Sequence, residues 1–375
     1  MAEGAGGGGL TLGNGGGVSV ANGNCLSNGG DFSVVEDDEE GEYADLEPFF
    51  FDEAEAVADH ERQMRREQEA ARKQEQRVLA AKMNKAVIDA ITDYDPKQGG
   101  MYYNRFSLAN FSYFNIDEES PLEPMRYSDK IYNEGDQHWP FFAVDFLSVK
   151  IISLDIDFPI HVYGTVIARD SLDSKCVYLF QRDKEHSQLI NSKDESLFLT
   201  GPKRGLVLVA DAYIETDLKT KDHHGQEVKE LSKGLCSVRG IASRDLDKCK
   251  IESELLATRL STVEVEATLA IDVLQGEFYG KITARTSSIP SSILLHDSKV
   301  VGVMTCDGKR VVQLSRRVVA VCLKDKLEVT AVAQTGDVEC EGTIALTPAL
   351  SGRVEGELAV GSTKMVVMVT WSVLD

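Results

Sequence analysis

The sequence lacks the features that mark exported, membrane-spanning and zinc-binding proteins. Its seven cysteines are far apart and include no Cys-x-x-Cys pair, which is typical of reduced thiols in a cytosolic or nuclear setting. The N-terminus has neither the basic and apolar regions of a signal peptide nor the arginines of a transit peptide. Apolar runs are short or interrupted by charge, well below the roughly 20 residues of a spanning helix. We therefore expect a cytoplasmic or nuclear protein that makes no membrane contact.

Positive charge is missing from residues 1–59, which hold fourteen Asp or Glu and no Lys or Arg. The formal net charge of the chain is -21, so most of the acidity belongs to this tail. Nucleic acid and anionic lipid surfaces attract clusters of Lys and Arg, and we therefore expect no nucleic acid contact by the acidic tail.

Residues 1–52 are predicted to be a disordered tail, first glycine-rich and then acidic. Residues 1–30 contain twelve glycines, whose ordering costs more backbone entropy than their burial can repay. The acidic part carries a Pro-Phe-Phe-Phe run at residues 48–51. This run is either a short motif that orders on a partner or a segment that packs on the neighbouring domain.

Residues 53–93 are predicted to form a helix, because they are rich in Ala, Glu, Gln, Arg and Lys and contain few helix breakers. A heptad of Val57, Met64, Ala71 and Val78 supplies half of a coiled-coil seam, since the other core positions hold Glu or Gln. A solvated helix stabilised by i,i+4 ion pairs is the favoured alternative.

The last turns of this predicted helix differ from the rest, because their apolar residues recur at helical spacing. Such a stripe docks on the body of its own chain, which we favour, or on a partner. Its members are Leu79, Met83, Val87 or Ile88, and Ile91.

Residues 94–142 are dense in aromatic side chains and punctuated by Pro and Gly. This composition predicts an irregular lead-in that packs against a core. Aromatic side chains can also stack on bases, but that role requires a basic groove, and this stretch is acidic.

Residues 143–375 are predicted to be a β-rich domain, because apolar and polar residues alternate with a period of two. The pattern is clear over residues 263–273 and again over 353–360, and residues 206–214 read as a strand buried on both faces. A change of phase at Ile151 and Ile152 predicts a β-bulge there. About ten or more short strands indicate an antiparallel β-sandwich or a barrel-like domain.

Several phrases in this β-rich part resemble a plant family, abundant in cereal grasses, known as the domain of unknown function 6598. The phrases are VYGTVIARDSLDSK (162–175), YLFQRD (178–183), LTGPKRGLVL (199–208), VEATLAIDVL (265–274), GKITARTSS (280–288), VQLSRRVVAV (312–321) and VTWSVL (369–374). The resemblance implies a β-rich domain of a plant protein. It transfers no catalytic residue, because the family has no established activity.

The resemblance also raises an alternative, an enzyme-associated role, since some relatives are joined to ribosome-inactivating rRNA N-glycosidase domains. Such enzymes use a Glu-Ala-x-Arg core on a buried helix, and this chain contains Glu69, Ala70, Ala71 and Arg72. These residues lie in a charged helix with no folded domain before it, so a chance match is favoured and no role is assigned.

Other candidate sites have a structural interpretation that is simpler than the functional one. Gly356 with Gly361–Lys364 differs from a phosphate loop in order and is followed by a strand. The adjacent His223 and His224 lack further ligands at metal-binding spacing, and His161 fits a strand position.

Two sets of charged residues complete the candidates. The carboxylate pairs Asp155 with Asp157 and Asp245 with Asp247 could share a cation, but solvated turns explain them more simply. A second set is expected to form structural ion pairs at strand ends rather than a ligand site; it comprises Arg169, Asp170, Asp173, Arg316 and Arg317.

No residue is assigned as catalytic, cofactor-binding or metal-binding. The sequence favours a non-catalytic binding or scaffold module that recruits a protein partner, either through the β-rich domain or through the acidic and helical arm.

Overall fold

The computed structural model describes residues 52–374, except for residues 97–98, 133–140, 142, 153–155, 210, 222–227, 240–249, 253–255, 302, 307–308 and 336–337. The chain divides within its long helix into two units, residues 1–67 and 68–375, and every strand belongs to the second unit. The predicted acidic tail and the Phe run at 48–51 lie outside the described residues, as do His223, His224, Asp155, Asp245 and Asp247.

Helix α1 (Glu53–Ala90) confirms the start and type of the helix predicted over residues 53–93, but it ends earlier, because residues Thr92–Asp95 form a strand. It begins where the carboxylate of Asp52 accepts the backbone N–H of Ala54 at 2.9 Å, which satisfies one of the free donors of the first turn. The side chains of Lys85 and Asp89 form an i,i+4 ion pair at 2.7 Å. None of the residues of α1 is buried, in agreement with a solvated helix.

The end of α1 packs on the lead-in segment through a small apolar cluster. Ile91 is buried with Phe111 and Ile116, and Val87 and Ile88 pack against them. The prediction that the apolar stripe docks on its own chain is therefore confirmed for these three positions of the helix end. It is wrong for Leu79 and Met83, whose side chains are 58% and 48% exposed.

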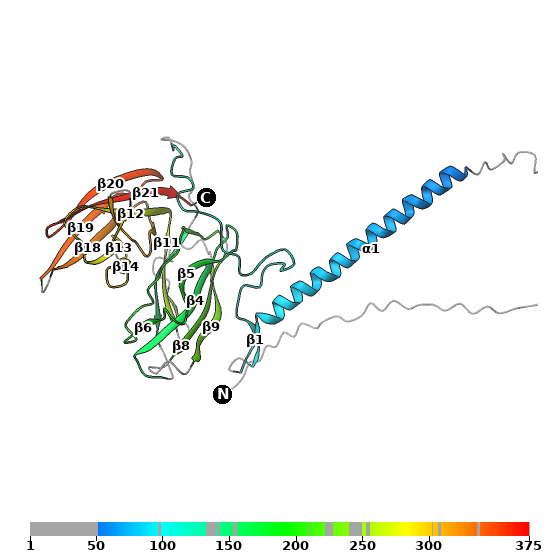
Figure 1. Cartoon of the computed structure of the whole chain (residues 1–375), viewed down its shortest axis with the longest axis horizontal. Helices are drawn as coiled ribbons and strands as arrows, with labels where there is room; N and C mark the ends of the chain where they lie inside the picture. Colours follow the sequence, from blue (N-terminus) through cyan, green and yellow to red (C-terminus); the bar gives the residue numbers. More distant parts are fainter. Residues whose placement is uncertain are drawn as a thin grey trace, which may run out of the picture. The chain divides into compact units, whose positions relative to one another are not determined.

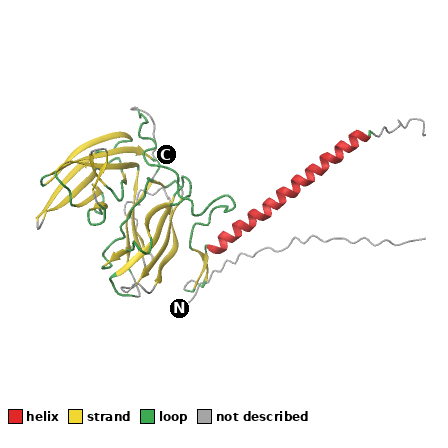
Figure 2. Ribbon diagram, viewed as in Figure 1, coloured by secondary structure: helices red, strands yellow, loops and turns green. Residues whose placement is uncertain are grey.

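The lead-in begins with a hairpin of β1 (Thr92–Asp95) and β2 (Gly100–Tyr103) and continues in turns and irregular stretches through residue 132. Figure 2 shows that strands make up most of the remaining chain and that α1 is the long helix before them. The prediction of a mainly β, antiparallel fold preceded by one helix is confirmed.

Two groups of strands follow one another along the chain and are coloured separately in Figure 1, green to yellow and then yellow to red. The first group forms two antiparallel sheets, ordered β10-β11-β3-β7 and β5-β4-β8-β9, with β6 paired to β4. Its strands are β3 (Ala143–Ile151), β4 (Ile160–Arg169), β5 (Val177–Arg182), β6 (Gln188–Ile190), β7 (Leu206–Val207), β8 (Asp211–Lys221), β9 (Val228–Arg239), β10 (Lys250–Glu252) and β11 (Leu256–Val263).

The second group forms two further antiparallel sheets, ordered β15-β16-β12-β21-β20, with β17 paired to β12, and β14-β13-β18-β19. Its strands are β12 (Val265–Gln275), β13 (Gly280–Thr286), β14 (Ile293–Asp297), β15 (Val303–Cys306), β16 (Lys309–Val312), β17 (Val318–Val321), β18 (Leu327–Thr335), β19 (Val338–Leu346), β20 (Ser351–Val360) and β21 (Thr363–Val373). We refer to the two groups as the first sandwich and the second sandwich.

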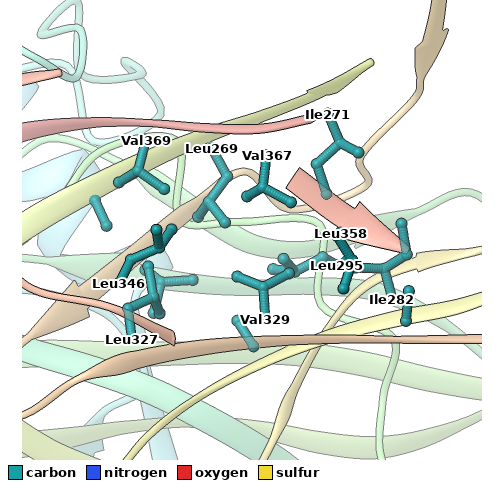
Figure 3. Close-up of a cluster of buried hydrophobic side chains, with 14 of the residues drawn as sticks. Leu269, Ile271, Ile282, Leu295, Leu327, Val329, Leu346, Leu358, Val367 and Val369 are labelled. Carbon is teal, nitrogen blue, oxygen red and sulfur yellow. The ribbon is translucent and has the colours of Figure 1, made fainter. Parts of the chain in front are cut away.

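Each sandwich encloses its own hydrophobic core. In the second, alternate residues of β12 and β21 face those of β13 and β18, as Figure 3 shows for Leu269, Val367 and Val329. In the first, β3 and β7 of one sheet face β4, β5 and β8 of the other around Phe146 and Phe180, both fully buried. Burial of each large apolar side chain contributes about 1.5–3 kcal/mol, so two separate cores stabilise the chain.

Two local predictions about strands are wrong. The bulge in β3 lies at Leu147, because Ser148 pairs with Arg259 while Phe146 pairs with Leu260; the strand simply ends at Ile151. The single strand predicted over residues 206–214 is two strands, β7 and β8, which belong to opposite sheets of the first sandwich. In both segments the apolar residues continue beyond the end of one strand. The alternation of apolar and polar residues therefore did not reveal where the strand bulges or ends.

A buried ion pair joins the two sandwiches. Arg316, in the turn between β16 and β17, bonds the carboxylate of Asp145 on β3 and donates to the carbonyl oxygen of Phe146 at 2.6 Å. The other carboxylate oxygen of Asp145 accepts the backbone N–H of Ala320 at 3.1 Å. Arg316 and Asp145 are 1% and 2% exposed, so their mutual bonds replace the water that both have lost.

Removal of one partner of this pair should destabilise the protein strongly. We expect Arg316→Met to lower the free energy of unfolding by about 3–5 kcal/mol, because Asp145 is left buried without its counter-charge. The double variant Arg316→Met with Asp145→Leu should recover most of that loss, since no charge then stays buried. Urea unfolding of the three proteins measures the difference, and a double variant as unstable as the single one would contradict it.

Candidate functional site

The buried charges of the first sandwich hold the lead-in in place. Arg169, at the end of β4, bonds Glu215 of β8 at 2.6 Å and the carbonyl oxygen of Ile116 at 2.6 Å. The same carboxylate accepts the side chain of Arg105 at 2.9 Å and the backbone N–H of Phe106 at 2.9 Å. Glu215 is thus fully engaged in fastening the lead-in to the sandwich.

A second buried pair lies beside the first. Arg204 bonds both oxygens of Asp170, at 2.6 Å and 3.0 Å, and reaches Asp173 at 3.3 Å. Asp170 also accepts the backbone N–H of Val207 at 2.9 Å. Two-point bonding to a guanidinium is the strongest geometry available to a carboxylate, and here it fixes one loop against another.

The ion pairs predicted for the charged set are therefore present for Arg169, Asp170, Asp173 and Arg316. Arg204, which completes the pair with Asp170, lies in the phrase LTGPKRGLVL and was not singled out from the sequence. Arg317 is exposed, and its carbonyl oxygen accepts the backbone N–H of Leu269 at 2.8 Å.

Glu266 is a buried carboxylate whose hydrogen bonds come from backbone groups. Its two oxygens accept the N–H groups of Gly205 and of Met125, the latter at 2.7 Å. Burial raises the pKa of Glu266, against the opposing effect of these two donors. Burial acts in the same direction on Glu215, but the hydrogen bonds and charges of Arg169 and Arg105 together hold the pKa of that carboxyl below its ordinary value.

The remaining sequence candidates do not converge. Glu69 and Arg72 are exposed on α1, which is not the buried setting that the N-glycosidase core requires. Gly361 and Thr363 belong to the hairpin between β20 and β21, where the Thr363 hydroxyl donates to the carbonyl oxygen of Glu277 at 2.6 Å. His161 is half-buried on β4 as expected for a strand residue.

Asp157 is exposed. Within the described part of the chain, no three His, Cys, Asp or Glu side chains gather where they could hold a metal ion. No helix in this described part is long and apolar enough to cross a membrane.

Two hollows open on the second unit of the chain. The first, about 820 Å³, lies between α1 and residues 107–113, where Asn84 accepts the backbone N–H of Phe111 at 2.9 Å. The second, about 600 Å³, lies between the two sandwiches and is named here the inter-sandwich cleft. It is lined by residues 147–148, 182, 187–189, 195–199, 281, 292–294, 297, 300 and 316.

The inter-sandwich cleft combines apolar walls with charged groups. Leu197 of the first sandwich and Ile293 of the second are buried at its base. Arg316 lines it as well, so the ion pair that joins the sandwiches also forms part of its wall. A cleft of this size and mixed lining at the junction of two domains is the usual setting of a ligand site.

Arg182, the last residue of β5, lines the cleft and differs from the paired arginines. Its guanidinium lies 5.9 Å from the ring centre of Phe198, and one terminal nitrogen donates to the carbonyl oxygen of His186 at 3.1 Å. Its Nε is buried without a hydrogen-bond partner among the described residues. Burial lowers the pKa of Arg182. The sequence signal was available, since Arg182 lies in the phrase YLFQRD, close behind its apolar residues.

Comparison with known proteins identifies a family but no activity. The model of the family described as Domain of unknown function (DUF6598) matches residues 143–369. No curated protein matches the sequence. The structure of Extended-Synaptotagmin 2, C2A- and C2B-domains, is 8% identical, with 66% of this chain and 96% of that chain covered and a TM-score of 0.24. Human GIVD cytosolic phospholipase A2 in complex with methyl gamma-linolenyl fluorophosphonate is 10% identical, with 62% and 32% covered and a TM-score of 0.22. At such values neither likeness indicates a function.

The opposite pKa shifts of Glu215 and Glu266 predict opposite pH dependence. The pKa of Glu215 is lowered from 4.5, so its contribution to stability is present above that pH and is lost as the pH falls through the folded-state pKa. The pKa of Glu266 is raised from 4.5, so its contribution is present below that pH and is lost as the pH rises through the folded-state pKa.

We therefore expect the cost of Glu215→Gln to shrink as the pH falls below about 4.5 and that of Glu266→Gln to shrink as the pH rises above it. Each variant removes one carboxylate and serves as the control for the other. Unfolding in urea across a pH series measures both, and parallel curves would contradict the assignment.

Arg182 should contribute little to stability compared with its paired counterparts. Because it has no carboxylate partner among the described residues and its hydrogen bond goes to the carbonyl oxygen of His186, Arg182→Met should lower the free energy of unfolding by no more than about 1 kcal/mol. The matched variant Arg204→Met should lower that free energy by about 3–5 kcal/mol, since Asp170 loses its counter-charge. Thermal and urea unfolding compare the two, and an equal loss in both would show that Arg182 has a structural partner.

Proposed function

We propose that this chain, which belongs to the family described as a domain of unknown function (DUF6598), is a non-catalytic binding module whose ligand site is the inter-sandwich cleft. The family resemblance predicted over residues 143–375 is confirmed over residues 143–369, about three fifths of the chain. The family itself names no activity, so the proposal depends on the geometry of the two sandwiches.

The observation that supports the proposal most is that the buried carboxylates are all engaged in hydrogen bonds within the protein. Glu215, Asp170 and Asp145 each bond a guanidinium and a backbone N–H, and Glu266 bonds two backbone N–H groups. Groups held in this way position segments of chain and are poorly placed to move protons. One of these pairs reaches the cleft, since Arg316, which bonds Asp145, lines it, and a wall fixed in this way suits binding.

A protein partner forms part of the proposal, as the sequence suggested. Two surfaces could carry it: the cleft, and the exposed apolar residues Val78, Leu79 and Met83 on α1. The cleft is favoured, because it belongs to the region that the family shares, whereas α1 precedes that region.

Capture from plant extract with three forms of the full chain distinguishes these surfaces. Ser292→Trp places a large ring at an exposed position of the cleft, and Leu79→Glu with Met83→Glu makes the α1 stripe charged. We expect partners to be retained by the α1 variant and lost by the cleft variant.

The reverse result would assign recruitment to the helical arm. Saturable turnover of any substrate by the wild-type chain, abolished by Ser292→Trp, would contradict the non-catalytic proposal. Release of adenine from ribosomes that depends on Glu69 would favour the enzyme-associated alternative.

A further inference from the structure

The inter-sandwich cleft has a positive charge, on Arg182, to which no carboxylate of the described residues is bonded. Four arginines of the second unit that are buried or half-buried bond a carboxylate at 2.9 Å or less: Arg105, Arg169, Arg204 and Arg316. Arg182 is also half-buried, but its contacts are the carbonyl oxygen of His186 and the ring of Phe198. A desolvated guanidinium without an acid is costly, and the cost falls when an anion binds it.

The two carboxylates that line the cleft are already engaged. Glu195 accepts the backbone N–H of Asn191 at 2.9 Å and its side-chain amide at 3.1 Å. Asp297 accepts the backbone N–H of Lys299 at 3.0 Å and faces the ammonium of Lys281 at 3.5 Å. Neither is bonded to Arg182, so the side of the cleft formed by the end of β5 stays positive.

The guanidinium of Arg182 is held in a defined position. Phe198 lies at one side of it, and the carbonyl of His186 fixes one terminal nitrogen at 3.1 Å. Its Nε has no protein partner among the described residues. A guanidinium that is oriented before binding suits an oxygen anion, because it offers a fixed positive charge and directed N–H donors.

The rest of the cleft is suited to an apolar body. Leu197 and Ile293 are 3% and 4% exposed at its base, and Leu147 and Leu294 are half-buried beside them. The volume of about 600 Å³ falls within the roughly 300–1,000 Å³ range of small-molecule sites. An occupant of this shape therefore carries one charged end and an apolar remainder.

We propose that the inter-sandwich cleft binds a small amphipathic oxyanion, a carboxylate or a phosphate on an apolar body, with Arg182 as the residue that contacts the anionic group. The inference rests on the proposed function in that it takes the cleft to be the binding site. It adds the chemical class of the ligand and the residue that recognises it.

Calorimetric titration of the full chain with three matched probes tests the proposal. The probes are decanoate, decyl phosphate and decanol, used below the concentrations at which they form micelles. We expect the wild type to bind at least one of the two anions at least tenfold more tightly than decanol, whether the carboxylate or the phosphate is the better ligand. Tighter binding of decanoate would assign the site to carboxylates, and tighter binding of decyl phosphate to phosphates.

Arg182→Met should weaken the binding of the preferred anion at least tenfold and leave that of decanol unchanged. The matched control is Arg285→Met, which removes an exposed guanidinium that pairs with Glu328 on the second sandwich. This control should bind all three probes as the wild type does. Arg182→Lys keeps the charge but not the planar fork, and it should give intermediate affinity.

Two results would overturn the inference, and they bear differently on the proposed function. If the wild type and Arg182→Met bind the anions and decanol equally well but Ser292→Trp blocks them, the cleft is a binding site without anion selectivity and the proposed function stands. If no probe binds the wild type, the ligand class is wrong. The proposed function then falls only if Ser292→Trp also retains every captured partner.

Discussion

The structure depends on one ion pair, which joins the first sandwich to the second. Asp145 lies on the first strand of the first sandwich, and Arg316 lies in a turn of the second, so a charge from each core meets its counter-charge at the junction. Around this pair, Ala143 and Val207 of the first sandwich pack with Ala320 and Leu374 of the second. If the sandwiches packed in another way, each of the two charged groups could be buried without its counter-charge. The ion pair therefore makes the arrangement of the sandwiches specific.

The cleft is a consequence of that arrangement. At the junction Arg316 bonds Asp145, whereas Arg182, which lines the cleft together with Lys281 and Asp297, has no carboxylate bonded to it among the described residues. Arginine side chains thus have two roles in this chain. Paired guanidinium groups fasten segments, and a guanidinium without an acid is available to a ligand.

The sequence predicted the elements better than their assembly. Alternation along β12 and composition along α1 are local signals, and both elements were confirmed with their type. The presence of two cores, the bulge at Leu147 and the separation of β7 from β8 depend on which strands pair across long stretches of chain. The same holds for the candidate site: Arg182 lies in a phrase that the sequence did mark, but Phe198 and Ile293 reach it only through the fold.

The central claim is that the two sandwiches are held at a fixed separation, so that the cleft exists before any ligand binds. Spin-label amino acids placed at exposed Gln181 of the first sandwich and exposed Glu341 of the second would report it. Pulsed dipolar spectroscopy of the ligand-free chain should give one narrow distance distribution. A broad distribution in the wild type, or one that becomes narrow only when a ligand is added, would contradict the account.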